Sequence, residues 1–304
     1  MTKTRDSVYT NTDAVYQEIC DFLDALAPLD PYMLWESGRM NFWRYNVHAD
    51  KDPQAAFFRD NVHLWRSEDD ALVALFISEY GQNDFFVEVM PEYRDLYPDI
   101  LRWVEDVWAR TRSTIEIDVF SNGVEKIRRL KAHGFRFKCH SENWHIYDLD
   151  EVDLDYALPE GFRVVAFSDA PDYASRVALV RSAFSNPDYT ETRLRSLMAS
   201  PDYVDAYNLS VVSPAGQHVA YCVGWPERNS QDTGYIEPVG THADFRRRGF
   251  ASAVIKACFG RMKANGVRTV EIASGAEPNI SNFLYDSLRP KSKREIHKYT
   301  KAVA

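Results

Sequence analysis

The sequence predicts an α+β protein (α/β mixed) with two tandem domains, each a mixed, mostly antiparallel sheet flanked by helices. The chain has 304 residues, of which 45% are hydrophobic and 27% charged, as is typical of about two globular domains. Strand-like and helix-like segments also follow one another in the same order in both halves. We expect domains at residues 1–150 and 161–304, joined by an acidic linker at 151–160.

The first half begins with an amphipathic helix, which Thr12 can cap and which ends before Pro28. An irregular aromatic stretch follows it. The remaining expected elements are strands at 61–66, 71–80 and 85–90, a helix that Pro98 opens, a strand at 114–120, a helix at 124–133 and a closing strand at 144–149.

The second half repeats this order. We expect a strand at 162–167, helices at 171–184 and 190–198, a hairpin of 209–213 with 218–225, a strand at 233–241, a helix at 249–265, a strand at 267–274, a helix at 279–288 and a final strand at 294–303. The first domain therefore has a counterpart for most elements of the second.

A short similarity supports a duplication. The string Val-Met-Pro-Glu-Tyr-Arg at 89–94 aligns with Thr-His-Ala-Asp-Phe-Arg at 241–246, an offset of 152 residues from Arg94 to Arg246. Each string follows an apolar strand, carries an acid, an aromatic residue and an arginine, and precedes a helix and a strand. Six residues alone are compatible with chance, but the agreement of the flanking elements favours a duplicated domain.

Charge and cysteine content exclude several classes of protein. The 36 Lys and Arg residues against 45 Asp and Glu give a net charge of -9, so no nucleic-acid or membrane partner is expected. The amino-terminal segment lacks the apolar core of a signal peptide, which favours a cytoplasmic protein. The four cysteines are widely spaced, as is typical of buried thiols, and no metal is expected. Either a monomer or a homodimer is compatible with the sequence.

The strongest motif follows the strand expected at 233–241. There the sequence Arg246-Arg247-Arg248-Gly249-Phe250-Ala251 opens a helix. Free backbone N–H groups, the helix dipole and arginine side chains together favour an anion such as a diphosphate, and the small Gly249 and Ala251 allow close approach. A solvated basic face is the alternative interpretation of this arginine cluster.

This pattern resembles the GNAT superfamily of acetyl-CoA-dependent N-acetyltransferases. The signature of that family, Arg or Gln, two residues, Gly, one residue, then Gly or Ala, is met by Arg246, Gly249 and Ala251. The resemblance covers about 162–304 and, more weakly, the first half, in a layout similar to that of tandem members such as mycothiol synthase. It implies acetyl-CoA as the acyl donor.

The resemblance also implies site residues. The loop of Arg246, Arg247, Arg248, Gly249, Phe250 and Ala251 would bind the diphosphate, and the strand end of Val239, Gly240 and Thr241 would lie beside the pantetheine arm. Either Asn279 or Asn282 would contact the cofactor, and Tyr285 would protonate the departing thiolate. A buried structural tyrosine is the alternative for Tyr285.

The chemistry itself asks for a base. An alkylamine has a pKa of roughly 10, so it must lose a proton before it can attack a thioester. Glu237, on the strand expected at 233–241, is the candidate base, and it would act directly or through water. The alternatives are that this glutamate faces solvent or pairs with an arginine.

The two copies differ at the motif. Where the second copy has Arg248-Gly249-Phe250, the first has Leu96-Tyr97-Pro98, and Asp95 replaces Arg247. The first domain is therefore expected to be a degenerate copy without a phosphate loop. The second copy also departs from the family, because Ser287-Leu288-Arg289 stands where many members have Gly-Phe.

The expected function is transfer of an acetyl group from acetyl-CoA to a primary amine of a small molecule, by direct attack in a ternary complex. A CoA-binding or ligand-binding regulatory module that has lost transferase activity is the alternative. Transfer to a peptide acceptor is a third hypothesis.

Overall fold

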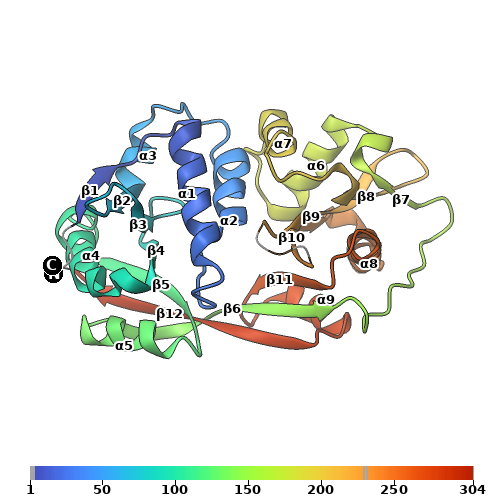
Figure 1. Ribbon diagram of the computed structural model, residues 1–304. Helices are drawn as coiled ribbons and strands as arrows, with labels where there is room; N and C mark the ends of the chain where they lie inside the picture. The colour runs from blue at the N-terminus through green and yellow to red at the C-terminus, as the bar shows by residue number, and fades with distance from the viewer. Residues whose placement is uncertain (1–3, 229, 231, 304) are drawn as a thin grey trace. The chain divides into compact units, whose positions relative to one another are not determined.

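The computed structural model describes residues 4–228, 230 and 232–303 (Figure 1). The chain forms two compact units, described separately below. The first unit holds the described residues up to 40, residues 51–142 and those from 295 onward; the second holds 41–50 and 143–294. These units differ from the expected domains in three places, because 41–50 and 143–150 join the second unit and the residues from 295 onward join the first.

The first half of the chain contains most of the first unit. Its strands are β1 (Arg5–Val8), β2 (Val62–Arg66), β3 (Leu72–Ile77), β4 (Asp84–Val89), β5 (Thr114–Phe120) and β6 (Arg136–Asp148), and its helices are α1 (Asp13–Leu26), α2 (Ser37–Phe42), α3 (Ala56–Asn61), α4 (Tyr97–Trp103) and α5 (Val124–Ala132). A π-helical segment at Val104–Trp108 extends α4.

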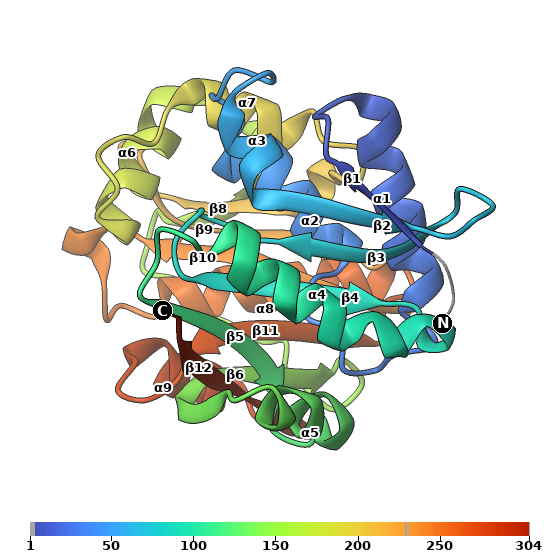
Figure 2. The same cartoon turned by 90° about the vertical axis from the view of Figure 1, so that its left-hand side faces the viewer.

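The sheet of the first unit runs in the order β1-β2-β3-β4-β5-β12, where β12 is Ser292–Ala302. Pairing is antiparallel from β1 to β4, parallel between β4 and β5, and antiparallel between β5 and β12. Helix α4 lies on one face of these strands and α1 on the other (Figure 2). The last strand is in this unit because Ile296 to Ala302 pair along the whole of β5.

The second unit contains the remaining elements. Its strands are β7 (Arg163–Ala166), β8 (Asn208–Val212), β9 (His218–Pro226), β10 (Thr233–Thr241) and β11 (Thr269–Gly275), and its helices are α6 (Tyr173–Phe184), α7 (Glu191–Met198), α8 (Phe250–Ala264) and α9 (Ile280–Ser287). The strand order is β11-β10-β9-β8-β7, with only the β10–β11 pair parallel. The mixed, mostly antiparallel sheet that the sequence predicts is thus confirmed.

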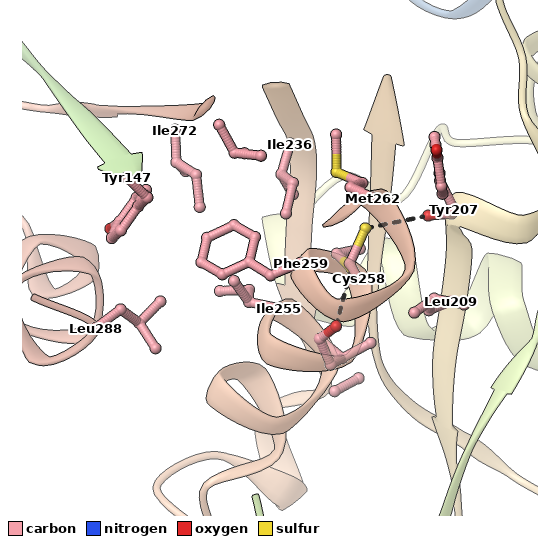
Figure 3. Packing of buried hydrophobic residues seen from close by; sticks show 14 of the residues in the cluster. Tyr147, Tyr207, Leu209, Ile236, Ile255, Cys258, Phe259, Met262, Ile272 and Leu288 are labelled. Atoms are coloured by element: carbon pink, nitrogen blue, oxygen red, sulfur yellow. Dashed lines mark hydrogen bonds between the residues drawn. The ribbon is translucent and has the colours of Figure 1, made fainter. Parts of the chain in front are cut away.

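The main core of the second unit lies between its sheet and α8. Cys258, Phe259 and Met262 of α8 pack against Ile236 and Ile272 from two neighbouring strands (Figure 3). All five side chains are almost completely buried. Since burial of an apolar side chain contributes roughly 1.5–3 kcal/mol, this layer fixes the position of α8 on the sheet.

The cysteines agree with the expectation at three of four positions. Cys20, Cys222 and Cys258 are buried free thiols, whereas Cys139 is exposed on β6. The expectation of a buried thiol is wrong at Cys139, because the first residues of β6 are solvent-exposed.

Most element boundaries agree with the sequence patterns to within a few residues, and Thr12 caps α1 by accepting from the Val15 amide at 3.3 Å. The structure adds α2, α3 and β1, which occur where no clear periodicity was visible. It also extends β6 back to Arg136. Residues Arg136 to Cys139 are all exposed, so the alternation that marks a half-buried strand is missing there.

In the part of the chain that the structure describes, no helix has the length and apolar character needed to cross a membrane.

Stability should fall at acid pH because of His218 at the start of β9. Its Nδ1 accepts from the Ser210 hydroxyl at 2.7 Å and its Nε2–H donates to the Ala170 carbonyl at 3.0 Å, so both nitrogens are satisfied in the neutral form. Burial, aided by the nearby charge of Arg176, lowers the pKa of His218 to about 4. The unfolded chain therefore binds this proton first as pH falls.

We expect His218 to remove about 2 kcal/mol of unfolding free energy between roughly pH 7 and pH 4. Urea unfolding of the wild type and His218→Gln across this range measures the effect, because subtraction cancels the other titrating groups. The variant should be less stable near neutral pH and should approach the wild type at acid pH. A constant difference would contradict the assignment.

Candidate active site

Strand β10 leaves its parallel neighbour part-way along its length. The described register between β10 and β11 runs from Thr233 to Tyr235, whereas β10 continues to Thr241. On its other side β10 stays paired with β9, with a register shift between Ile236 and Val239. The bulge contains Glu237, whose side chain is exposed. The second half of β10 therefore keeps one paired edge, and Glu237 projects from its most irregular point.

The loop after β10 ends at an uncapped helix. Gly249 adopts the left-handed conformation with φ of 79° at the N-cap of α8, and no side chain caps this end. Arg247 also has positive φ, at 58°. A Cβ at Gly249 would meet no atom within 4 Å among the described residues. The start of α8 is thus uncapped and the space beside Gly249 is open, as an anion such as a diphosphate requires.

The three arginines of this loop are not equivalent. Arg246 donates to the carbonyls of Ala183 at 3.0 Å and Ser182 at 3.4 Å, at the end of α6. The guanidinium of Arg248 lies 5.2 to 5.6 Å from the centres of three rings, those of Phe162, Phe245 and Phe250. Arg247 is exposed and has no side-chain partner among the described residues. Its guanidinium is the one of the three that neither holds α6 nor stacks on an aromatic ring.

Gly240 is required for packing. A Cβ at this position would lie 2.6 Å from the Tyr221 ring and 3.0 Å from the Cβ of Ala183. The absence of a side chain therefore brings α6 and β9 against β10. Its neighbours Val239 and Thr241 are half-buried, so their backbone lies near the surface of the expected site.

The structure separates the two asparagines that the sequence left as alternatives. Asn282 is 2% exposed, and both polar atoms of its amide have protein partners: Oδ1 accepts from Ser274 and Asn143, and Nδ2 donates to the Gly275 carbonyl at 2.9 Å. Asn279 caps α9 through its Oδ1, which accepts from the Ser281 amide. Its Nδ2 has no acceptor among the described residues. Asn279 is therefore the better candidate for a ligand contact.

Tyr285 lies on α9 and is 6% exposed. The Tyr147 hydroxyl donates to its backbone carbonyl at 2.9 Å, and its ring lies 5.4 Å from that of His145. The Tyr285 hydroxyl itself has no hydrogen-bond partner within the described chain. Burial first, then the charge of Glu237, raises the pKa of Tyr285, so the phenol stays protonated at neutral pH.

Two buried residues near this site give no signal in the sequence. Arg176 on α6 is completely buried, and its guanidinium lies 4.2 Å from the centre of the Tyr221 ring. Burial raises the pKa of Tyr221, and the charge of Glu237 contributes to the shift. An arginine in an amphipathic helix and a tyrosine in a hairpin are both ordinary, so only the fold shows that they lie together beside β10.

The comparisons with known proteins agree with this geometry. Residues 177–286 match the model of the acetyltransferase (GNAT) family, a span that holds β8 to β11, the Gly249 loop and Tyr285. This segment is a GNAT domain, and the resemblance noted from the sequence is confirmed. A comparison with curated proteins gives no match.

Solved structures share the fold over nearly the whole chain. A GCN5-related N-acetyltransferase from Sphaerobacter thermophilus is 21% identical with a TM-score of 0.62, covering 97% of this chain and 95% of its own. A tandem GNAT protein from the clavulanic acid biosynthesis pathway is 15% identical with a TM-score of 0.66, covering 99% of each chain. An acetyltransferase from Colwellia psychrerythraea is 10% identical with a TM-score of 0.61, covering 98% and 100%.

The chain therefore has the fold of tandem GNAT proteins, as the internal repeat predicted. The family match supports acetyl transfer in general terms.

Proposed function

We propose that the protein is an N-acetyltransferase that moves an acetyl group from acetyl-CoA to a primary amine of a small molecule, with the site in the second unit. The observation that carries the proposal is the uncapped start of α8, where Gly249 leaves open space in front of free backbone amides. The diphosphate of the donor suits this position, with the Arg247 side chain as an additional cation.

Glu237 and Tyr285 are suited to the two proton transfers. Acetyl-CoA supplies a thioester carbonyl. As the amine nitrogen forms its bond to that carbon, Glu237 takes the amine proton, directly or through water, and a backbone N–H near Val239 stabilises the oxyanion. When the C–S bond breaks, the sulfur leaves with its electron pair and Tyr285 gives it a proton. The partnerless hydroxyl of Tyr285 is free to make that contact.

The acceptor class is the least constrained part of the proposal. The overall charge of -9 is compatible with a cationic amine, and the exposed carboxylate of Glu237 would attract one. We therefore favour a small primary amine over a peptide. The same anion site would also serve a regulatory module that binds CoA without catalysis, which is the second candidate function.

Two measurements test the proposal. The first is calorimetric titration with acetyl-CoA, and the second is a colorimetric assay for free thiol in the presence of primary amines. We expect one site per chain and thiol release that depends on an amine. Binding without thiol release from any amine or peptide would favour the regulatory module. Release with peptides alone would replace the small-molecule acceptor, and absence of binding at millimolar acetyl-CoA would overturn the proposal.

Replacement of Glu237 by Gln should lower turnover at neutral pH by about tenfold or more, because the amide cannot accept the amine proton. The affinity for acetyl-CoA should change little, since this side chain is not part of the loop proposed to bind the diphosphate. Steady-state rates from about pH 7 to pH 10 measure the effect. The loss should shrink at high pH, where more of the free amine is already neutral; an equal loss at every pH would argue against the base.

A further inference from the structure

The first unit contains a cavity at the carboxyl end of β4. Its volume is about 240 Å³, and it is bounded by β4, the starts of α4 and α5, and the loop at 29–32. We call it the β4 cavity, and it is lined by the hydroxyl-bearing Tyr97 and by six charged residues: Asp30, Glu88, Arg94, Glu125, Lys126 and Arg129. All of them belong to the first unit. No step of the proposed acetyl transfer uses any of them.

A buried ion pair forms the floor of the β4 cavity. Glu88 is 2% exposed; its Oε1 accepts from the amides of Leu34 and Trp35, both at 3.1 Å, and its Oε2 accepts from Lys126 at 3.3 Å. The carboxylate is thus well satisfied. The ammonium is not, because Glu88 is the only described partner of Lys126 and two of its three N–H groups remain.

Tyr97 adds an unpaired hydroxyl. The residue is 5% exposed and lines the cavity, and its hydroxyl is a buried polar atom without a partner among the described residues. Such a group is costly to bury unless something satisfies it. Burial raises the pKa of Tyr97 to about 12, so the hydroxyl remains a donor at neutral pH.

The surrounding charges define the ligand. Arg94 pairs with Asp30 at 3.2 Å, and Arg129 donates to Glu125 at 3.0 Å, so three cations face three carboxylates and the cavity has no net charge. Lys126, Tyr97 and Arg94 nevertheless carry N–H and O–H donors for which no acceptor is found among the described residues. A ligand with acceptor oxygens fits this excess. A single negative charge is favoured over two, because Glu88 and Asp30 would repel a dianion.

We propose that the β4 cavity binds a small monocarboxylate, whose oxygens accept from Lys126 and from the Tyr97 hydroxyl. This site is additional to the proposed acetyl-CoA site and does not depend on it. Tyr97 occupies the position that corresponds to Gly249 at the offset of 152 residues. A tyrosine at this position blocks a diphosphate from the backbone of the first copy, and its hydroxyl supplies a donor for a smaller anion.

Calorimetric titration of the full chain with glycolate and lactate tests the proposal, with methylamine as a comparison and with inorganic phosphate compared in Gly249→Trp, where the proposed anion site of the second unit is closed. We expect one site per chain for a monocarboxylate and weaker or no binding of phosphate and methylamine. The site should persist in Gly249→Trp, which alters only the second unit. Absence of carboxylate binding at tens of millimolar, preference for phosphate, or loss of binding in Gly249→Trp would each overturn the proposal.

Tyr97→Phe separates a ligand contact from a structural role. Loss of one hydrogen bond should weaken carboxylate binding about tenfold, while the melting temperature without ligand should stay level or rise, because an unpaired buried hydroxyl is removed. Tyr299→Phe is the matched control. Tyr299 is 3% exposed in the same unit but does not line the cavity, so the carboxylate affinity of this variant should equal that of the wild type. Unchanged binding in Tyr97→Phe would contradict the assignment.

Discussion

Gly249→Trp should abolish acetyl-CoA binding while the protein stays folded. The Cβ of the new side chain would enter the open space in front of α8, so the indole would occupy the place proposed for the diphosphate. Loss of two or more charge-assisted hydrogen bonds corresponds to about 3 kcal/mol or more, hence a dissociation constant raised by about a hundredfold. Calorimetric titration measures this change.

The substitution also places a non-glycine residue at positive φ, which itself costs about 1 kcal/mol or more of stability. Gly266→Trp controls for this strain, because Gly266 has φ of +92° and likewise meets no atom within 4 Å, yet it follows the far end of α8. Both variants should melt at similar temperatures, and only Gly249→Trp should lose acetyl-CoA. Equal affinity in the two variants would count against the loop as the donor site.

Tyr285→Phe should lower turnover by about a hundredfold with little change in acetyl-CoA affinity, because the hydroxyl is proposed to act only when the thiolate departs. Stability should be unaffected, since this hydroxyl makes no hydrogen bond within the described chain. A thiol-release assay with an amine that the wild type acetylates measures turnover, and calorimetry measures the affinity for acetyl-CoA. In the wild type, the raised pKa of Tyr285 should keep the rate from declining at alkaline pH until beyond the ordinary range of a phenol.

Tyr147→Phe provides the contrast. Its hydroxyl donates to the Tyr285 carbonyl at 2.9 Å, and this carbonyl also accepts from the Leu288 amide at 3.2 Å, so the substitution removes one of two hydrogen bonds and should cost about 0.5–1.5 kcal/mol of stability. Turnover should remain within a few-fold of the wild type, because the Tyr285 hydroxyl is still present. If Tyr285→Phe turned over normally, a different group or water would have to protonate the thiolate.

The strand, loop and helix that carry the proposed site could be located from the sequence because their signals are local. A glycine between an arginine and a small residue, after an apolar strand and before a helix, is a continuous string, and it is folded as a strand, a loop and α8 as expected. The duplication was equally visible, since two strings kept the same neighbours at one offset. Local propensity and hydrophobic period decide such features.

The different contacts of the three arginines Arg246, Arg247 and Arg248 could not be predicted from the sequence. Adjacent in sequence, they reach the carbonyls of α6, a cluster of aromatic rings, and solvent. The sequence also left both Asn279 and Asn282 as candidates. In the structure Asn279 caps α9, whereas Asn282, one turn further along, lies against β11 and β6. These differences depend on which distant elements surround each side chain.

The sequence by itself determined the order of elements, the repeat and the glycine-containing loop before α8, because each arises from residues close together in the chain. Only the tertiary structure decided that the last strand completes the first unit, that Arg176 lies against Tyr221, and that Tyr97 and Lys126 line one cavity. Strand pairing and the burial of polar groups join residues far apart in sequence, and their free energies depend on the surroundings that the complete fold creates.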